Sequence, residues 1–92
     1  MSNTTRCYIN ADLVHPRASN NPHYHHMDVI PTQGPLAGRP IVLGLSRNLL
    51  YYIQSNIASG KIAPTANVRF FGTHIPSTSG DEKFVVERIE LN

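Results

Sequence analysis

Hydrophobic and polar positions alternate along 6–14 and again along 23–30, which is the period of a half-buried strand. In the first segment, one face carries Cys7, Ile9, Ala11 and Leu13. In the second segment, Met27 and Val29 share one face. Residues 15–22 between the two segments are rich in Pro, Ser and Asn, so we expect a loop there.

The middle of the chain changes period. A short apolar run at 41–45 predicts a buried strand, and it is followed by Ser46, a favoured helix N-cap. From Arg47 onward the apolar spacing becomes four residues, which predicts a helix. Gly60 suits the left-handed position that ends a helix, and Pro64 prevents its continuation.

Two further strands are predicted at 67–75 and 83–91. In the first, parity with Val68 predicts that Phe70 lies in the core and Phe71 points outward. In the second, the apolar positions change face part-way along, which predicts a bulge. The two sets are Phe84 and Val86 on one face, and Val85, Ile89 and Leu91 on the other.

The order is three strands, a helix and two strands. The chain has 92 residues, which leaves no room for a second core, so we expect a single domain over 1–92. This order is that of a five-stranded OB-fold, a Greek-key barrel with the helix between strands 3 and 4. The expected fold class is therefore all-β with one helix.

The second half of the chain resembles bacterial single-stranded DNA-binding proteins and their primosomal replication relatives. The matching pieces are 41–44 (IVLG), the helix from Arg47, the Gly60-Lys61 turn, 68–72 (VRFFG) and 84–89 (FVVERI). The resemblance implies an OB-fold that binds single-stranded DNA during DNA replication. The chain lacks tryptophan and an acidic C-terminal tail, both common in that family, which favours a reduced module, either nearer the primosomal type or a small phage or plasmid protein.

Charge permits an anionic partner without demanding one. Eight Lys and Arg against six Asp and Glu give a net charge of +2, with no basic stripe in the sequence. Charged residues are only 15% of the chain, which suits either self-association or a partner that covers part of the surface. One of Tyr51 and Tyr52 on the apolar helix is expected to leave the core, and small barrels often pair through their strands, so a homodimer or higher oligomer is expected. Neither a membrane-spanning run nor a signal segment is visible, and the single cysteine, Cys7, suits a reducing cytoplasm.

The nucleic-acid hypothesis depends on aromatic side chains interleaved with cations. Bases stack on aromatic faces, while Lys and Arg follow the phosphates. The expected stacking residues are Tyr8, Tyr24, Phe71 and His26. The expected phosphate contacts are Arg6, Arg17, Arg39, Arg69 and Lys83. The loops at 32–39 and 76–81 are expected to hold the strand in place.

Other chemistry is weakly indicated. His23 and His25, with His15 or Asp28, have the spacing of a partial metal site, but the second close ligand pair of structural zinc sites is missing. Nucleophile motifs and phosphate-cradling glycine loops are missing too, so neither an enzyme nor a cofactor is expected. The alternative function is a protein-interaction module, either an assembly subunit or a phage-encoded inhibitor of a host protein.

Overall fold

The computed structural model describes residues 4–78, 80 and 82–91, and it contains six strands and one helix within them. The strands are β1 (Thr5–Asp12), β2 (Arg17–Ala18), β3 (Tyr24–Val29), β4 (Ile41–Ser46), β5 (Asn67–Ile75) and β6 (Glu82–Glu90). The helix α1 (Arg47–Ala58) lies between β4 and β5. All five predicted strands and the predicted helix are present, with bounds that differ by at most two residues.

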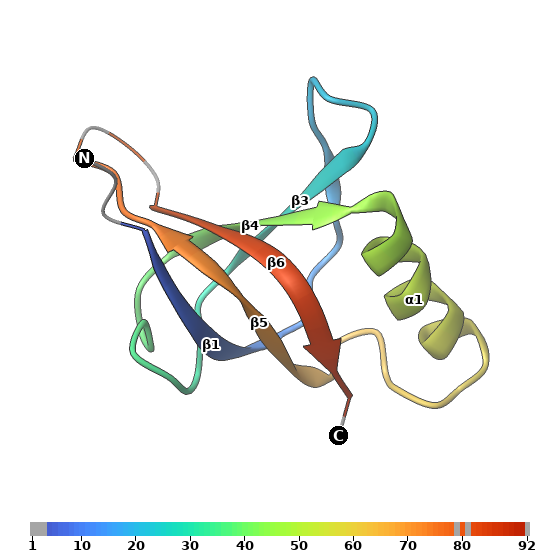
Figure 1. Cartoon of the computed structure of the whole chain (residues 1–92). Helices are drawn as coiled ribbons and strands as arrows, with labels where there is room; N and C mark the ends of the chain where they lie inside the picture. Colours follow the sequence, from blue (N-terminus) through green and yellow to red (C-terminus); the bar gives the residue numbers. More distant parts are fainter. Residues whose placement is uncertain (1–3, 79, 81, 92) are drawn as a thin grey trace.

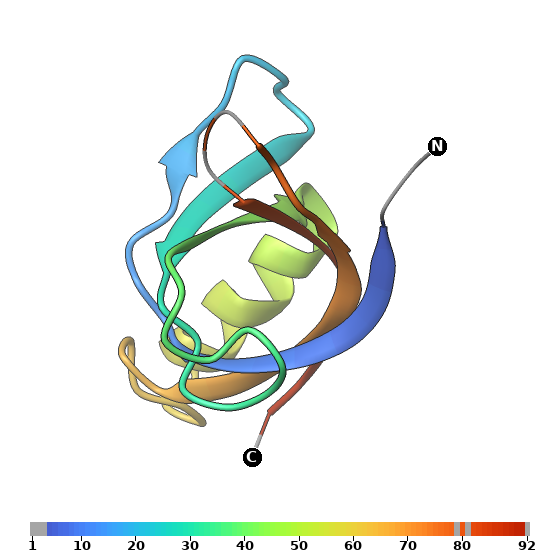
Figure 2. The ribbon, with the colours of Figure 1, turned by 90° about the vertical axis from the view of Figure 1, so that its left-hand side faces the viewer.

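The six strands form one mixed sheet in the order β1-β5-β6-β4-β3-β2 (Figure 1). Neighbouring strands are antiparallel, except that β4 and β6 are parallel. The sheet is strongly curved, and α1 covers one end of the curve (Figures 1 and 2). β1 and β2 are the two edges, and they are not paired with each other.

The predicted five-stranded OB-fold barrel is therefore wrong, because the sheet has a sixth strand and stays open. Closure needs the two edge strands to pair with one another. Instead, β2 pairs with β3 through Arg17 opposite His26 and so occupies the edge that β1 would need. The edge of β1 that faces away from β5 forms an isolated bridge from Asn10 to Gln33 in the 32–39 loop. The helix consequently follows the fourth strand rather than the third.

The core lies on the inner face of the curved sheet. It is formed by Ile9, Ala11, Leu13, Met27, Val29, Leu43, Leu45, Val68, Phe70, Phe84, Val86 and Ile89, among others. From α1, Leu50 and Ile53 complete this core. Phe70 is 0% exposed, whereas Phe71 is half-buried on the other face, so the predicted directions of the two side chains are confirmed.

The ends of α1 follow from local chemistry, as predicted. The side chain of Ser46 accepts a hydrogen bond from the backbone N of Leu49 at 3.3 Å, which satisfies one of the free donors of the first turn. After the helix, Gly60 adopts a φ of 79°, the left-handed conformation that glycine tolerates best.

A bulge interrupts the pairing of β5 with β6. Phe71 lies opposite Arg88, but the next residue, Gly72, lies opposite Val86, so Glu87 is the extra residue. This confirms the predicted bulge and explains how Val86 and Ile89 both reach the core. Gly72 is required at this point, because a Cβ there would lie 2.0 Å from the backbone oxygen of Val85.

Within the part of the chain that the structure describes, α1 is too short and too polar to cross a bilayer.

Candidate nucleic-acid interface

The outer face of the sheet carries most of the predicted site residues. Side chains alternate across a strand, so the neighbours of core residues point away from the core. Following the register from strand to strand gives one row that crosses all six strands. The row contains Arg6, Thr73, Val85, Gly44, His26 and Arg17. We call it the cross-sheet row.

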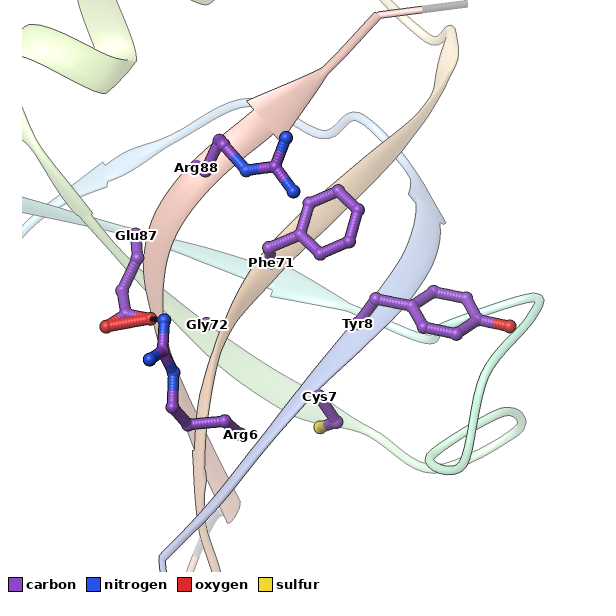
Figure 3. A pocket seen from close by; sticks show the side chains of 7 residues that line it. All are labelled: Arg6, Cys7, Tyr8, Phe71, Gly72, Glu87 and Arg88. Carbon is purple, nitrogen blue, oxygen red and sulfur yellow. Dashed lines mark hydrogen bonds and ion pairs between the residues drawn. The ribbon is translucent and has the colours of Figure 1, made fainter.

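Two aromatic side chains lie beside this row at the β1 edge. Tyr8 of β1 and Phe71 of β5 are opposite each other in the register. Their ring centroids are 6.3 Å apart with a tilt of 45°, a favourable geometry for an aromatic pair. Tyr8 is 36% exposed, so part of the pair is open to solvent. Figure 3 shows the two side chains on their neighbouring strands.

An arginine lies over each ring. The guanidinium carbon of Arg69 is 4.6 Å from the centroid of Tyr8, and that of Arg88 is 4.1 Å from the centroid of Phe71. Both distances are within the range of a cation–π contact. Arg69 is held in place because its Nε donates to Oδ1 of Asn10 at 2.9 Å. Figure 3 shows Arg88 reaching over Phe71 from β6. We call these four side chains, Tyr8, Phe71, Arg69 and Arg88, the aromatic–arginine cluster.

Arg88 was not among the residues selected from the sequence. Its side chain points outward because of the bulge: Glu87 is the extra residue, and after it the side chains of β6 alternate between the faces with the opposite parity. The broken apolar parity of 83–91 was the available signal, but it located the bulge only to within a few residues.

A shallow cavity of about 330 Å³ lies next to the two rings. Arg6 and Cys7 line it from β1, and Glu87 and Arg88 line it from β6 (Figure 3). Burial raises the pKa of the Cys7 thiol, so the thiol stays protonated at neutral pH and is a poor nucleophile. The lining thus offers two aromatic rings, two guanidinium groups and a carboxylate.

Carboxylates partly neutralise the cations of the outer face. Arg6 pairs with Glu87 at 2.9 Å, and Arg88 pairs with Glu90 at 3.0 Å. Arg17 donates to both oxygens of Asp28, at 2.7 and 3.0 Å, and this hydrogen bonding lowers the pKa of Asp28. A phosphate would have to compete with these exposed pairs, each of which is worth at most about 1 kcal/mol.

A second group of predicted residues lies farther along the outer face. Tyr24 and His26 are on β3, and Lys83 is on β6, with β4 between these two strands. Tyr24 is 40% exposed and His26 is half-buried. The predicted set is thus divided into two groups on one face, with Arg17 at the far end of the cross-sheet row.

Arg39 belongs to neither group. It forms an ion pair with Glu82, whose carboxylate is also 3.5 Å from Nε2 of His74. His74 follows the parity of Phe70, a core residue, so this cluster lies at the rim of the inner face.

The loop at 32–39 packs along the free edge of β1 near Tyr8. The backbone N of Asn10 donates to the oxygen of Gln33 at 3.1 Å, and the N of Thr32 donates to the oxygen of Asn10 at 2.6 Å. Gly34 has a φ of 103°, and a Cβ there would lie 2.6 Å from the oxygen of Tyr8. The second predicted clamp, 76–81, lies partly outside the described residues.

The histidines do not assemble a metal site in the described ranges, where no three His, Cys, Asp or Glu side chains are grouped suitably. His23 precedes β3 instead of lying on it with His25, as the predicted strand required.

A scan against protein-family models, a search of curated proteins and a search of solved structures each found no match to this chain.

Proposed function

We propose that this protein binds single-stranded nucleic acid, DNA in preference to RNA, on the outer face of its sheet. The observation that carries the proposal is the aromatic–arginine cluster, in which two partly exposed rings each have an arginine within 5 Å. Unpaired bases stack on aromatic rings and on guanidinium planes, at about 1–3 kcal/mol per base for an aromatic ring. Bases within a duplex are already stacked and paired, so their faces are not available to this surface.

The charge arrangement predicts moderate salt dependence. Of the outer-face cations, Arg69 and Lys83 have no carboxylate partner among the described residues. Arg6 and Arg88 can exchange their carboxylates for phosphates. Two to four phosphate contacts correspond to a slope of log K against log salt of about −1.4 to −2.8 for a single strand.

The test is fluorescence anisotropy with a labelled twelve-nucleotide oligo-dT at two salt concentrations, with a duplex control. Tyr8→Ala and Phe71→Ala should each weaken binding about 5- to 150-fold, which is the tenfold-per-1.4 kcal/mol equivalent of one lost stack. Gln54→Ala is the control, because Gln54 is exposed on α1, away from the outer face. Unchanged affinity of a folded Tyr8→Ala variant, or no binding of wild type at low salt, contradicts the proposal.

A protein partner is the second candidate, and the observation that favours it is on α1. Tyr51 and the adjacent Tyr52, 47% exposed, are two large aromatic side chains on one helix without a covering element among the described residues. A second copy of the chain is the partner that the low charge content suggests. Sedimentation of wild type and of Tyr52→Ala tests this, since a weaker self-association of the variant is expected.

The proposed setting is the cytoplasm, where a free thiol such as Cys7 stays reduced.

A further inference from the structure

The cross-sheet row has a gap at its centre. Gly44 of β4 lies between Val85 of β6 and His26 of β3, and it has no side chain to fill the row. A Cβ placed on Gly44 would have no heavy atom within 4 Å. A notch of about 150 Å³ lies at this point, lined by Tyr24, His26, Val42, Gly44, Lys83, Phe84 and Val85. We call it the Gly44 notch.

The walls of the notch combine three kinds of chemistry. Val42 and Val85 supply apolar surface, and Tyr24 supplies an aromatic ring that is partly exposed. Lys83 supplies a cation, and its ammonium makes no ion pair within 4–78, 80 and 82–91. The Nδ1 atom of His26 is buried without a hydrogen-bond partner in the same part of the chain. An apolar floor, an aromatic wall and a free cation match the base and the phosphate of a nucleotide.

We propose that the Gly44 notch is a second base-binding subsite, which takes one nucleobase of the strand bound at the aromatic–arginine cluster. This inference rests on the proposed function and extends it. The base lies over Gly44, its ring contacts Tyr24 and Val85, and the adjoining phosphate contacts Lys83.

The size of the notch favours a pyrimidine. A cavity of about 150 Å³ is large enough for a single six-membered ring, as shown by an engineered cavity of that volume that holds benzene. The fused rings of a purine would extend beyond the notch and leave more of the base out of contact with its walls. The subsite therefore adds a preference for thymine or cytosine over adenine or guanine at one position of the strand.

The two subsites define a path across the sheet. Gly44 is three strands away from Tyr8 in the order β1-β5-β6-β4, which is about 14 Å across the sheet at the usual spacing of roughly 4.8 Å. Its row meets β1 at Arg6, two residues or about 7 Å along the strand from Tyr8. The diagonal of about 16 Å corresponds to about five nucleotides at the stacked rise of 3.4 Å, and to fewer in an extended strand. Sites this far apart contribute independently, so their mutational effects should multiply.

The experiment fills the notch. Gly44→Leu places a side chain into open space, and Ser55→Leu adds the same side chain on exposed α1 as a control. Gly44→Leu should weaken binding to the twelve-nucleotide oligo-dT at least fivefold and reduce the preference for oligo-dT over oligo-dA. Ser55→Leu should match wild type. Combined with Tyr8→Ala, Gly44→Leu should multiply the two losses.

The outcomes separate the subsite from the function. If wild type binds and Tyr8→Ala is impaired, but a folded Gly44→Leu binds as wild type does, the subsite is refuted while the proposed function stands. If wild type binds no oligonucleotide, the proposed function fails. If wild type binds oligo-dT and oligo-dA equally, the pyrimidine preference is refuted. Should Gly44→Leu not fold, Gly44→Ala decides, because its methyl group enters the same open space; a reduced preference for oligo-dT over oligo-dA is expected, and an unchanged preference refutes the subsite.

Discussion

Gly72→Ala is the substitution whose consequence follows most directly from the geometry. Gly72 lies opposite Cys7 on one side and Val86 on the other, immediately beside the bulge. Its added Cβ would lie 2.0 Å from the oxygen of Val85 and 2.9 Å from Cε1 of Phe84. Since non-bonded atoms reach their optimum near 3.5 Å, β6 would have to move away from β5 by about 1.5 Å.

The cost of that movement can be estimated. A ladder hydrogen bond near 2.9 Å is lost when the strands separate by more than about 0.6 Å, at roughly 1 kcal/mol per bond. Overpacking of the core side adds about 1–3 kcal/mol. Replacing a glycine within a strand by alanine stabilises the folded state by about 0.5–1 kcal/mol, because glycine loses more conformational entropy on folding. With one ladder bond lost, the net expectation is a loss of about 1–3.5 kcal/mol in the free energy of unfolding.

Urea unfolding followed by circular dichroism measures this difference, with Gly44→Ala as the matched control. Gly44→Ala adds the same methyl group where no atom lies within 4 Å, so its stability should equal or slightly exceed that of wild type. Gly72→Ala should also weaken oligo-dT binding, because moving β6 separates Arg88 from Phe71. A Gly72→Ala variant within 0.5 kcal/mol of wild type would show that the β5–β6 contact is not as close as described.

Three further predictions concern the core, the polar network and acid stability. Phe70→Ala, at a side chain with no exposed surface, should lower the unfolding free energy in urea by about 3–5 kcal/mol, and a loss below 1 kcal/mol would contradict its place in the core. Asn10→Ala should lower the unfolding free energy by about 1–3 kcal/mol in the same assay, because Asn10 is buried and its side-chain amide forms hydrogen bonds with both Arg69 and Asn67. An unchanged urea midpoint would refute this. The lowered pKa of Asp28 means that its ionised form is favoured in the folded state. The ion pair with Arg17 therefore stabilises the fold fully at a pH above the ordinary carboxyl pKa of about 3.9. This stabilisation is lost as the pH falls through the lower pKa that Asp28 has in the folded state. Both side chains are exposed, so the contribution should stay below about 1 kcal/mol, and NMR titration of Arg17→Ala should find the Asp28 pKa raised toward its ordinary value; no change would contradict the pairing.

Local features of this fold could be predicted from the sequence, because each depends on residues that are close together along the chain. Alternation located the longer strands, and parity separated buried Phe70 from outward Phe71. The N-cap at Ser46 and the left-handed Gly60 follow from side-chain hydrogen bonding and from glycine's conformational freedom. In each case the deciding contact lies within a few residues of the signal.

The open sheet could not be predicted from the sequence, because it depends on which strand pairs with the free edge of β3. Two residues, Arg17 and Ala18, make that pairing, and a segment this short has no periodicity. The Arg17–Asp28 ion pair adds to it from outside the backbone ladder. On the opposite edge, the 32–39 loop reaches β1 because Gly34 permits an approach that a side chain would block.

The same long-range pairing determines how the candidate site is laid out. Alternation alone places Tyr8, Tyr24 and Phe71 outside the core, but it does not say how far apart they lie. The strand order separates Tyr24 from the Tyr8–Phe71 pair by β6 and β4, so the three rings do not form one stack. In an open sheet these rings and the Gly44 notch lie along a track from one edge toward the other, whereas closure would have brought the two edges together. A strand that uses both subsites must therefore cross the sheet, and oligonucleotides too short to reach from Tyr8 to Gly44 should lose their sensitivity to Gly44→Leu while keeping their sensitivity to Tyr8→Ala.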